Sequence, residues 1–165
     1  MVRYLQRSVR QTVVDYTKLK LTELGWVDDP VNFGAEPVQF IEVDRREKVE
    51  RIDPTTVSIW IPNESADRIA ELGGGLYVTD IDIMVDIYAQ KAAYAINIGS
   101  DLKDIFRDRS IPLIDYVSSG STLVEAGMVE FMGAYIDRPA SPPNAIEFRG
   151  TYRTVRLYSR VWFED

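Results

Sequence analysis

The sequence contains no cysteine and no histidine. Without cysteine the chain has no disulfide framework and no thiol nucleophile, and without either residue it lacks the usual ligands of structural zinc. The absence of histidine also removes every catalytic triad that uses imidazole as its base. These absences leave only carboxylate-based chemistry open to an enzyme. We therefore expect a protein that is not an enzyme and that carries no metal or cofactor.

Long apolar runs are also missing. No stretch approaches the roughly 18 apolar residues that span a bilayer, and residues 1–11 (MVRYLQRSVRQ) lack the apolar centre of a secretion signal. We expect no membrane partner, and a protein that is made and assembled in the cytoplasm. The 165 residues, 45% apolar and 27% charged, predict one globular domain over 1–165 with a sizeable core.

Positive charge is scarce outside the N-terminus. Residues 1–25 carry five basic and two acidic side chains, whereas residues 26–165 carry 14 basic and 24 acidic ones. Binding to the phosphates of DNA or RNA needs a basic surface. Specific recognition of nucleic acid is therefore not expected.

The strongest pattern in the chain is the alternation of residues 76–89 (LYVTDIDIMVDIYA). The odd positions are mostly apolar, and the even positions include Asp80, Asp82 and Asp86. Successive side chains of a strand point to opposite faces, so this pattern predicts one buried face and one acidic face. Such a half-buried strand is typical of an antiparallel sheet covered on one side.

Helical periodicity marks two other segments. Apolar residues recur every three or four positions over 4–24, Leu19 among them, and again over 92–107, while Gly25 is a candidate left-handed cap. The remaining patterns predict strands over 38–44, 55–61, 128–137 and 146–163, a short helix over 65–72, and mostly loop over 111–127. This order predicts an α+β fold: a largely antiparallel sheet with two amphipathic helices packed on one face.

A highly charged stretch, DRREKVERIDP, separates the first two predicted strands. We expect these strands to be joined by a long charged hairpin tip near 44–54. The tip is either a solvated loop or a projection that meets a partner.

The three aspartates of the long strand allow three interpretations. Asp80, Asp82 and Asp86 form a solvated strand face, an electrostatic subunit interface, or part of a carboxylate-based metal or catalytic site. A metal site would need further oxygen ligands from another strand, and a glycosidase site would need a second carboxylate at a defined separation.

Two further sets of side chains are candidates for subunit contacts. Three arginines share one face of the first helix, which is either solvated or meets acidic surface of another copy. The last strand presents Tyr, Arg and Trp together, a composition enriched at protein interfaces. Opposite charges on separate patches favour head-to-tail contacts that close into rings. The candidate interface residues are therefore Arg3, Arg7, Arg10, Asp80, Asp82, Asp86, Tyr158, Arg160 and Trp162.

The order and style of these parts resemble a known family. A leading helix closes in LTELGW, and a strand pair follows around VQFIEVD and TTVSIWIP. A long strand then leads directly into a helix (YVTDIDIMVDIYAQKAAYAINIGSDLKDIF), and the chain ends in LYSRVWFED. In this combination the chain resembles the tail terminator, or tail completion, proteins of long-tailed bacteriophages, the group that includes the minor tail protein U type.

The resemblance implies a structural role in the virion. Members of this family form a hexameric ring on the last ring of the tail tube, which stops tube polymerisation. The ring presents a surface to the head-closure or connector protein, and DNA passes through its lumen without specific binding. The resemblance thus implies a homohexamer in the tail–neck region that is assembled in the host cytoplasm. It implies no enzymatic activity and no cofactor.

Other functions remain open at this point. The chain could be another neck component, such as a head-closure or connector protein, or a tail tube subunit. Tube subunits polymerise into long cylinders, whereas a terminator forms single rings, so the shape of the assembly separates the two. A carboxylate-based metal-binding enzyme built on Asp80, Asp82 and Asp86 is the alternative from a different class.

Overall fold

A computed structural model describes residues 5–27, 36–41, 55–62, 69–89, 91–116, 123–137 and 151–164. Arg3 and the charged stretch 44–54 lie outside these residues. In the described part of the chain, two helices and eight strands follow one another in the order α1 (Leu5–Glu23), β1 (Trp26–Val27), β2 (Glu36–Ile41), β3 (Thr55–Trp60), β4 (Ala70–Gly73), β5 (Leu76–Ala89), α2 (Ala92–Phe106), β6 (Ser110–Asp115), β7 (Val124–Asp137) and β8 (Thr151–Glu164).

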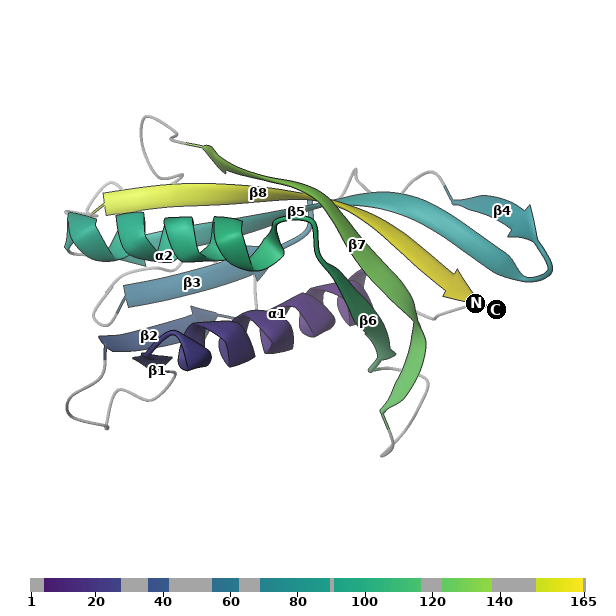
Figure 1. Ribbon diagram of the computed structural model, residues 1–165, viewed down its shortest axis with the longest axis horizontal. Helices are drawn as coiled ribbons and strands as arrows, with labels where there is room; N and C mark the ends of the chain where they lie inside the picture. The colour runs from purple at the N-terminus through teal and green to yellow at the C-terminus, as the bar shows by residue number, and fades with distance from the viewer. Residues whose placement is uncertain are drawn as a thin grey trace.

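The eight strands form one sheet. Its order is β1-β2-β3-β5-β8-β7-β6, and β4 pairs with β5 beside that row. The pairs β1–β2 and β2–β3 are parallel, and the other pairs are antiparallel. Both helices lie on the same face of the sheet, which curls around them (Figure 1). The predicted α+β fold with a largely antiparallel sheet is therefore confirmed.

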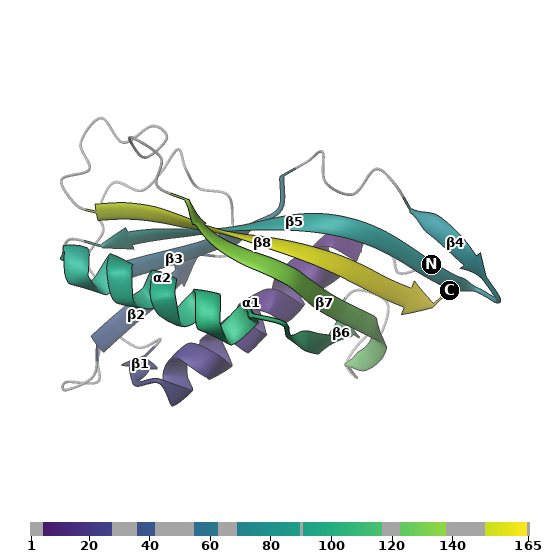
Figure 2. The same ribbon diagram turned by 45° about the horizontal axis from the view of Figure 1, so that its top comes forward.

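The core lies between the helices and the apolar face of β5. Ile81, Ile83, Val85 and Ile87 are fully buried, as the alternation predicted. Helix α2 packs on β5, β7 and β8 (Figure 2). The ring of Phe106, at its end, lies 5.7 Å from the ring of Tyr16 on α1 and 4.6 Å from that of Phe131 on β7, measured between centroids.

Helix α1 covers an open edge of the sheet. Strand β6 is the last strand of the row. The backbone N–H of its Ile114 donates to the hydroxyl of Thr12 over 3.1 Å, and that of Tyr116, just after the strand, donates to Ser8 over 3.3 Å. These hydroxyls satisfy groups that an exposed edge would offer to another chain. The Tyr116 phenol donates to Asp15, and burial together with this hydrogen bond raises its pKa.

Both helices begin and end within one residue of the predicted bounds, but one residue expected in the apolar stripe is exposed. Gly25 follows α1 with φ +95°, so the predicted left-handed cap is confirmed. Leu19, expected in the apolar stripe, is 56% exposed. Helix α1 instead buries Ser8, Thr12 and Thr17 beside its valines: the first two hydroxyls bond the backbone at the edge of β6, and Thr17 donates to the carbonyl of Val13.

The expectation of a charged hairpin near 44–54 is wrong in its topology. Val38 pairs with Thr55 and Ile41 with Ser58 in parallel register. Two parallel strands cannot be the arms of a hairpin, because their connection must return to the end where the first strand began. The charge of the stretch gave no information about the direction of the strands that flank it.

Two other predictions of local structure are corrected. The expected helix over 65–72 is wrong at its C-terminal end, where residues 70–73 form β4, and residues 63–68 lie outside the described part. The expected loop over 111–127 contains most of β6 and the start of β7. Pro112 lies within β6, where it is tolerated because β6 is an edge strand.

Candidate functional site

The side of β5, β8 and β7 that points away from the helices carries most of the candidate residues. We call this side the outer face. The opposite side faces the helices. Ile87 of β5 points there, since its Cδ1 would lie 3.7 Å from a Cβ added to Gly99 of α2. On the outer face Asp80 pairs in register with Arg160, which pairs with Glu130; Trp162 likewise pairs with Met128.

A charged row crosses the three strands of the outer face. The guanidinium of Arg160 donates to both carboxylate oxygens of Asp80, with Nε–Oδ1 at 2.8 Å and Nη2–Oδ2 at 3.2 Å. The hydrogen bond from Arg160 lowers the pKa of Asp80, and the same bond raises the pKa of Arg160. Trp162 Nε1 donates to Glu130 over 3.4 Å. Two predicted interface residues, Asp80 and Arg160, are thus held by each other.

Beside this row the outer face is apolar and aromatic. The register of β7 shifts between Phe131 and Gly133, so Met132 and Gly133 both turn outward. The ring of Tyr135 lies over Gly133, where any Cβ would come within 2.7 Å of it, and it meets Tyr158 edge-on at 5.5 Å. These residues line an open hollow of about 490 Å³. The sequence predicted Tyr158 but gave no sign of the bulge.

Asp86 lies on the same side of β5 as Asp80 and Asp82, but it is fully buried. Its carboxylate accepts hydrogen bonds from Trp60 Nε1 at 2.8 Å and from the hydroxyls of Tyr152 and Thr154 at 2.9 and 2.8 Å. The prediction that Asp86 belongs to an exposed acidic face is wrong, because β3 and β8 surround it with donors. Asp86 is therefore not available for a surface contact in this structure.

The arginines of α1 are only partly brought to the surface. Arg7 is exposed and Arg10 is half-buried, while Arg3 lies outside the described residues. Farther along the same face of the helix, Val14 and Leu21 are buried. The basic stripe that the spacing predicted is therefore short.

The three aspartates do not converge on one point. Asp80 and Asp86 are six residues apart along a strand, which is about 20 Å. Within the described residues, no group of three or more acidic side chains is placed to hold a metal ion. No helix in the same part of the chain is long and apolar enough to cross a membrane.

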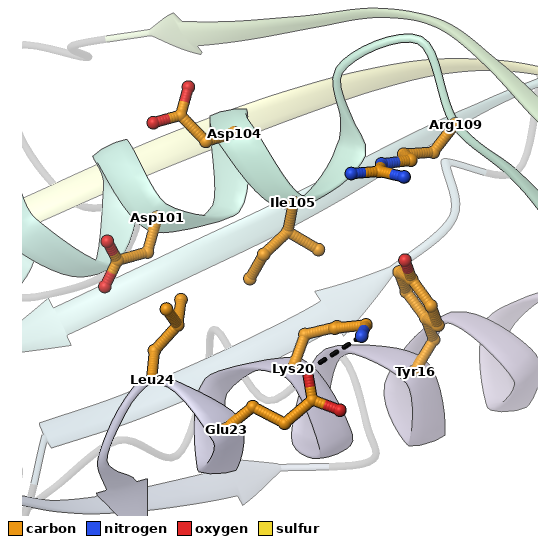
Figure 3. A pocket seen from close by; sticks show the side chains of 8 residues that line it. All are labelled: Tyr16, Lys20, Glu23, Leu24, Asp101, Asp104, Ile105 and Arg109. Atoms are coloured by element: carbon orange, nitrogen blue, oxygen red, sulfur yellow. Dashed lines mark hydrogen bonds and ion pairs between the residues drawn. The ribbon is translucent and has the colours of Figure 1, made fainter.

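Sequence reasoning missed a cleft between the two helices. This interhelical cleft, of about 330 Å³, is lined by Tyr16, Lys20, Glu23 and Leu24 from α1 and by Asp101, Asp104, Ile105 and Arg109 from α2 and the turn after it (Figure 3). Only the helical spacing of Tyr16, Lys20 and Glu23 hinted at a common face. Arg109 could not have been found, because its position depends on how α2 ends.

The acidic groups of the interhelical cleft already have partners. Glu23 pairs with Lys20 at 2.7 Å, Asp104 pairs with Arg107 at 3.0 Å, and Asp101 accepts the indole N–H of Trp26 at 2.9 Å. The hydrogen bond to Glu23 raises the pKa of Lys20. Arg109 is exposed, and among the described residues its guanidinium has no ion-pair partner. In Figure 3 that guanidinium points into the cleft above Tyr16.

Sequence reasoning also missed an arm formed by β4 and the first part of β5. Gly73, Gly74 and Gly75 make its turn, with φ values of +99°, +67° and +82°. A triple glycine suits such a turn, because other residues are strained at positive φ. The arm extends beyond the rest of the sheet (Figure 1), and its Ile69 and Leu72 are 44% and 54% exposed.

Comparison with known proteins gave no match, either to a protein-family model or to a curated protein.

Proposed function

We propose that the chain is a structural ring component of a phage tail, the tail terminator that caps the tail tube. A ring of identical subunits, six in the resembled family, sits on the last ring of the tube and ends its polymerisation. Its other side receives the head-closure or connector protein. The proposal rests on the resemblance in the order of elements, together with the outer face.

The observation that carries the proposal is the composition and exposure of the outer face. Met128 and Met132 are each 47% exposed and Tyr135 is 59% exposed, beside Tyr158, Arg160 and Trp162. Aromatic residues, methionine and arginine are the types enriched at protein interfaces. An isolated soluble domain rarely gathers so many exposed large side chains on one sheet face. This face therefore supports a protein that functions by assembling with others.

The charge of the chain suits a ring around DNA. A net charge of −7 disfavours tight binding of phosphates, so DNA can slide through the lumen. No cofactor is required for such a role.

The direct test is electron microscopy of the purified full chain, with its mass measured by light scattering. We expect closed single rings. Long cylinders would instead assign the chain to the tube subunits, and a monomer at all concentrations would overturn the proposal. The enzyme alternative would gain support from a divalent ion that raises the melting temperature of the wild type but not of Asp82→Asn.

A matched pair of variants links assembly to the outer face. Met132→Asp places a charge on that face, whereas Ile96→Asp places one on α2, where the side chain is similarly exposed at 45%. We expect Met132→Asp to abolish assembly and Ile96→Asp to leave it intact, with unchanged far-UV spectra in both. Equal effects of the two would remove the outer face from the proposal.

A further inference from the structure

The β4–β5 arm projects apolar and acidic side chains together. Glu71 lies opposite Tyr77 of β5, Leu72 follows it before the glycine turn, and Ile69 precedes β4; all three side chains are exposed. Among the described residues, Glu71 has no ion-pair partner, and β4 pairs with β5. The base of the arm is anchored, because Tyr77 of β5 stacks on Phe163 of β8 at 5.6 Å. The arm is therefore fixed to the sheet through β5, and β4, with Ile69 just before it, carries these exposed side chains on its outer side.

The interhelical cleft offers the complementary chemistry. Arg109 supplies a cation that has no ion-pair partner among the described residues. Lys20 lies near it, because the positive charge of Arg109 acts to lower the pKa of Lys20. Leu24 is 56% exposed at the other side of the cleft, and Ile105 is half-buried between the helices. A carboxylate beside an apolar side chain matches this arrangement.

We propose that the arm of one copy docks in the interhelical cleft of the next copy, with Glu71 paired to Arg109 and Leu72 packed on Leu24. This inference rests on the proposed ring, and it adds a contact between neighbouring subunits to the one that the outer face makes. The occupant is a second copy of this chain because both halves of the contact, an acid beside an apolar side chain and a cation beside an apolar side chain, are present on one molecule.

The placement of the two halves excludes a contact within one chain. The arm lies at one end of the molecule, and the end of α1 with Leu24 lies towards the other, next to β1 (Figure 1). Joining two different patches of identical subunits is a head-to-tail contact, which generates a closed ring when the rotation between subunits allows it.

Engineered cysteines test the contact, because the chain has none of its own. The variant carrying Leu24→Cys and Leu72→Cys together should, on mild oxidation, give a ladder of covalent oligomers that ends at the size of the ring. Each single variant should not cross-link with itself beyond background. A mixture of the two single variants should stop at dimers, because each subunit then carries only one cysteine. The bond forms only between docked subunits, since a disulfide needs Cα atoms within about 7 Å.

The matched control combines Leu72→Cys with Ile96→Cys. Ile96 is exposed on α2 but does not line the cleft. We expect no ladder from this pair. A ladder of equal strength would mean that cross-linking reports random collision, and it would overturn the proposed contact.

Charge reversal gives an independent test. Glu71→Arg and Arg109→Glu should each raise the concentration at half assembly by about tenfold, as loss of a paired interface charge does. The double variant should recover much of the wild-type value, because the pair is restored in reverse. Additive losses in the double variant would contradict the pairing.

The outcomes separate this contact from the proposed function. Rings that form without the cysteine ladder and without charge rescue would overturn the contact and leave the ring function standing. Absence of any oligomer of the wild-type chain would overturn both.

Discussion

The two ends of one strand face differ sharply. Asp80 and Asp86 stand on the same side of β5, yet Asp80 is exposed and paired with Arg160, whereas Asp86 is fully buried. The neighbours explain the difference. At the Asp86 end, β3 and β8 present an indole N–H and two hydroxyls to the carboxylate. At the Asp80 end, charged and aromatic side chains remain in contact with solvent. One end of the face is thus part of the folded core, and the other remains exposed.

The largest expected effect lies at the buried end. Asp86→Ala removes the carboxylate that accepts the indole N–H of Trp60 and the hydroxyls of Tyr152 and Thr154. Unsatisfied buried donors are costly, so we expect the free energy of unfolding to fall by about 3–5 kcal/mol. Urea denaturation followed by circular dichroism measures it. A loss below about 1 kcal/mol would show that these hydrogen bonds contribute little.

The opposite face of the same strand gives the next effect. Ile83 is fully buried in the middle of β5. Ile83→Ala should reduce the free energy of unfolding by about 2–4 kcal/mol, the range for removing a large core side chain. The same urea titration measures it, and Ile83→Val is the conservative control. If the two variants lost equally little, the core would not lie on this face.

These two sites show what the sequence can and cannot predict. Alternation identified β5 to the residue and correctly assigned Ile83 to the core, since side-chain direction follows from the backbone. It could not show that Asp86 is covered, because the donors come from Trp60 and Thr154, which are distant in sequence. The prediction of a hairpin at 44–54 failed for a similar reason, because the direction of a strand is set by its tertiary pairing. The interhelical cleft and the arm likewise depend on where α2 and β4 end.

At the exposed end the salt bridge should matter little and should depend on pH. Asp80→Asn should lower the free energy of unfolding by less than about 1 kcal/mol, as for other exposed ion pairs. Arg160 lowers the pKa of folded Asp80 below its ordinary value of 3.8. The stabilisation is therefore present above that value and is lost as the pH falls through the folded pKa. Unfolding curves of both proteins from pH 7 to pH 2 should converge at the acid end. A constant difference would contradict the pairing.

The smallest effect is expected at Asp82. This side chain is half-buried beside Tyr158. Asp82→Asn should change the free energy of unfolding by no more than about 0.5 kcal/mol, as most surface substitutions do. Any larger consequence should be confined to the assembled state, which light scattering reports. An unfolded Asp82→Asn monomer would mean that both ends of the face are structural.

Hydroxyl-radical footprinting of the assembled and the dissociated chain compares the two ends in one experiment. Met132 and Tyr135 are exposed, and Tyr88, on the same face near Asp86, is 3% exposed. We expect strong oxidation of Met132 and Tyr135 in the dissociated chain and clear protection on assembly, with Tyr88 unreactive in both states. Equal oxidation of Met132 and Tyr135 in the two states would contradict the claim that the outer face is an assembly surface.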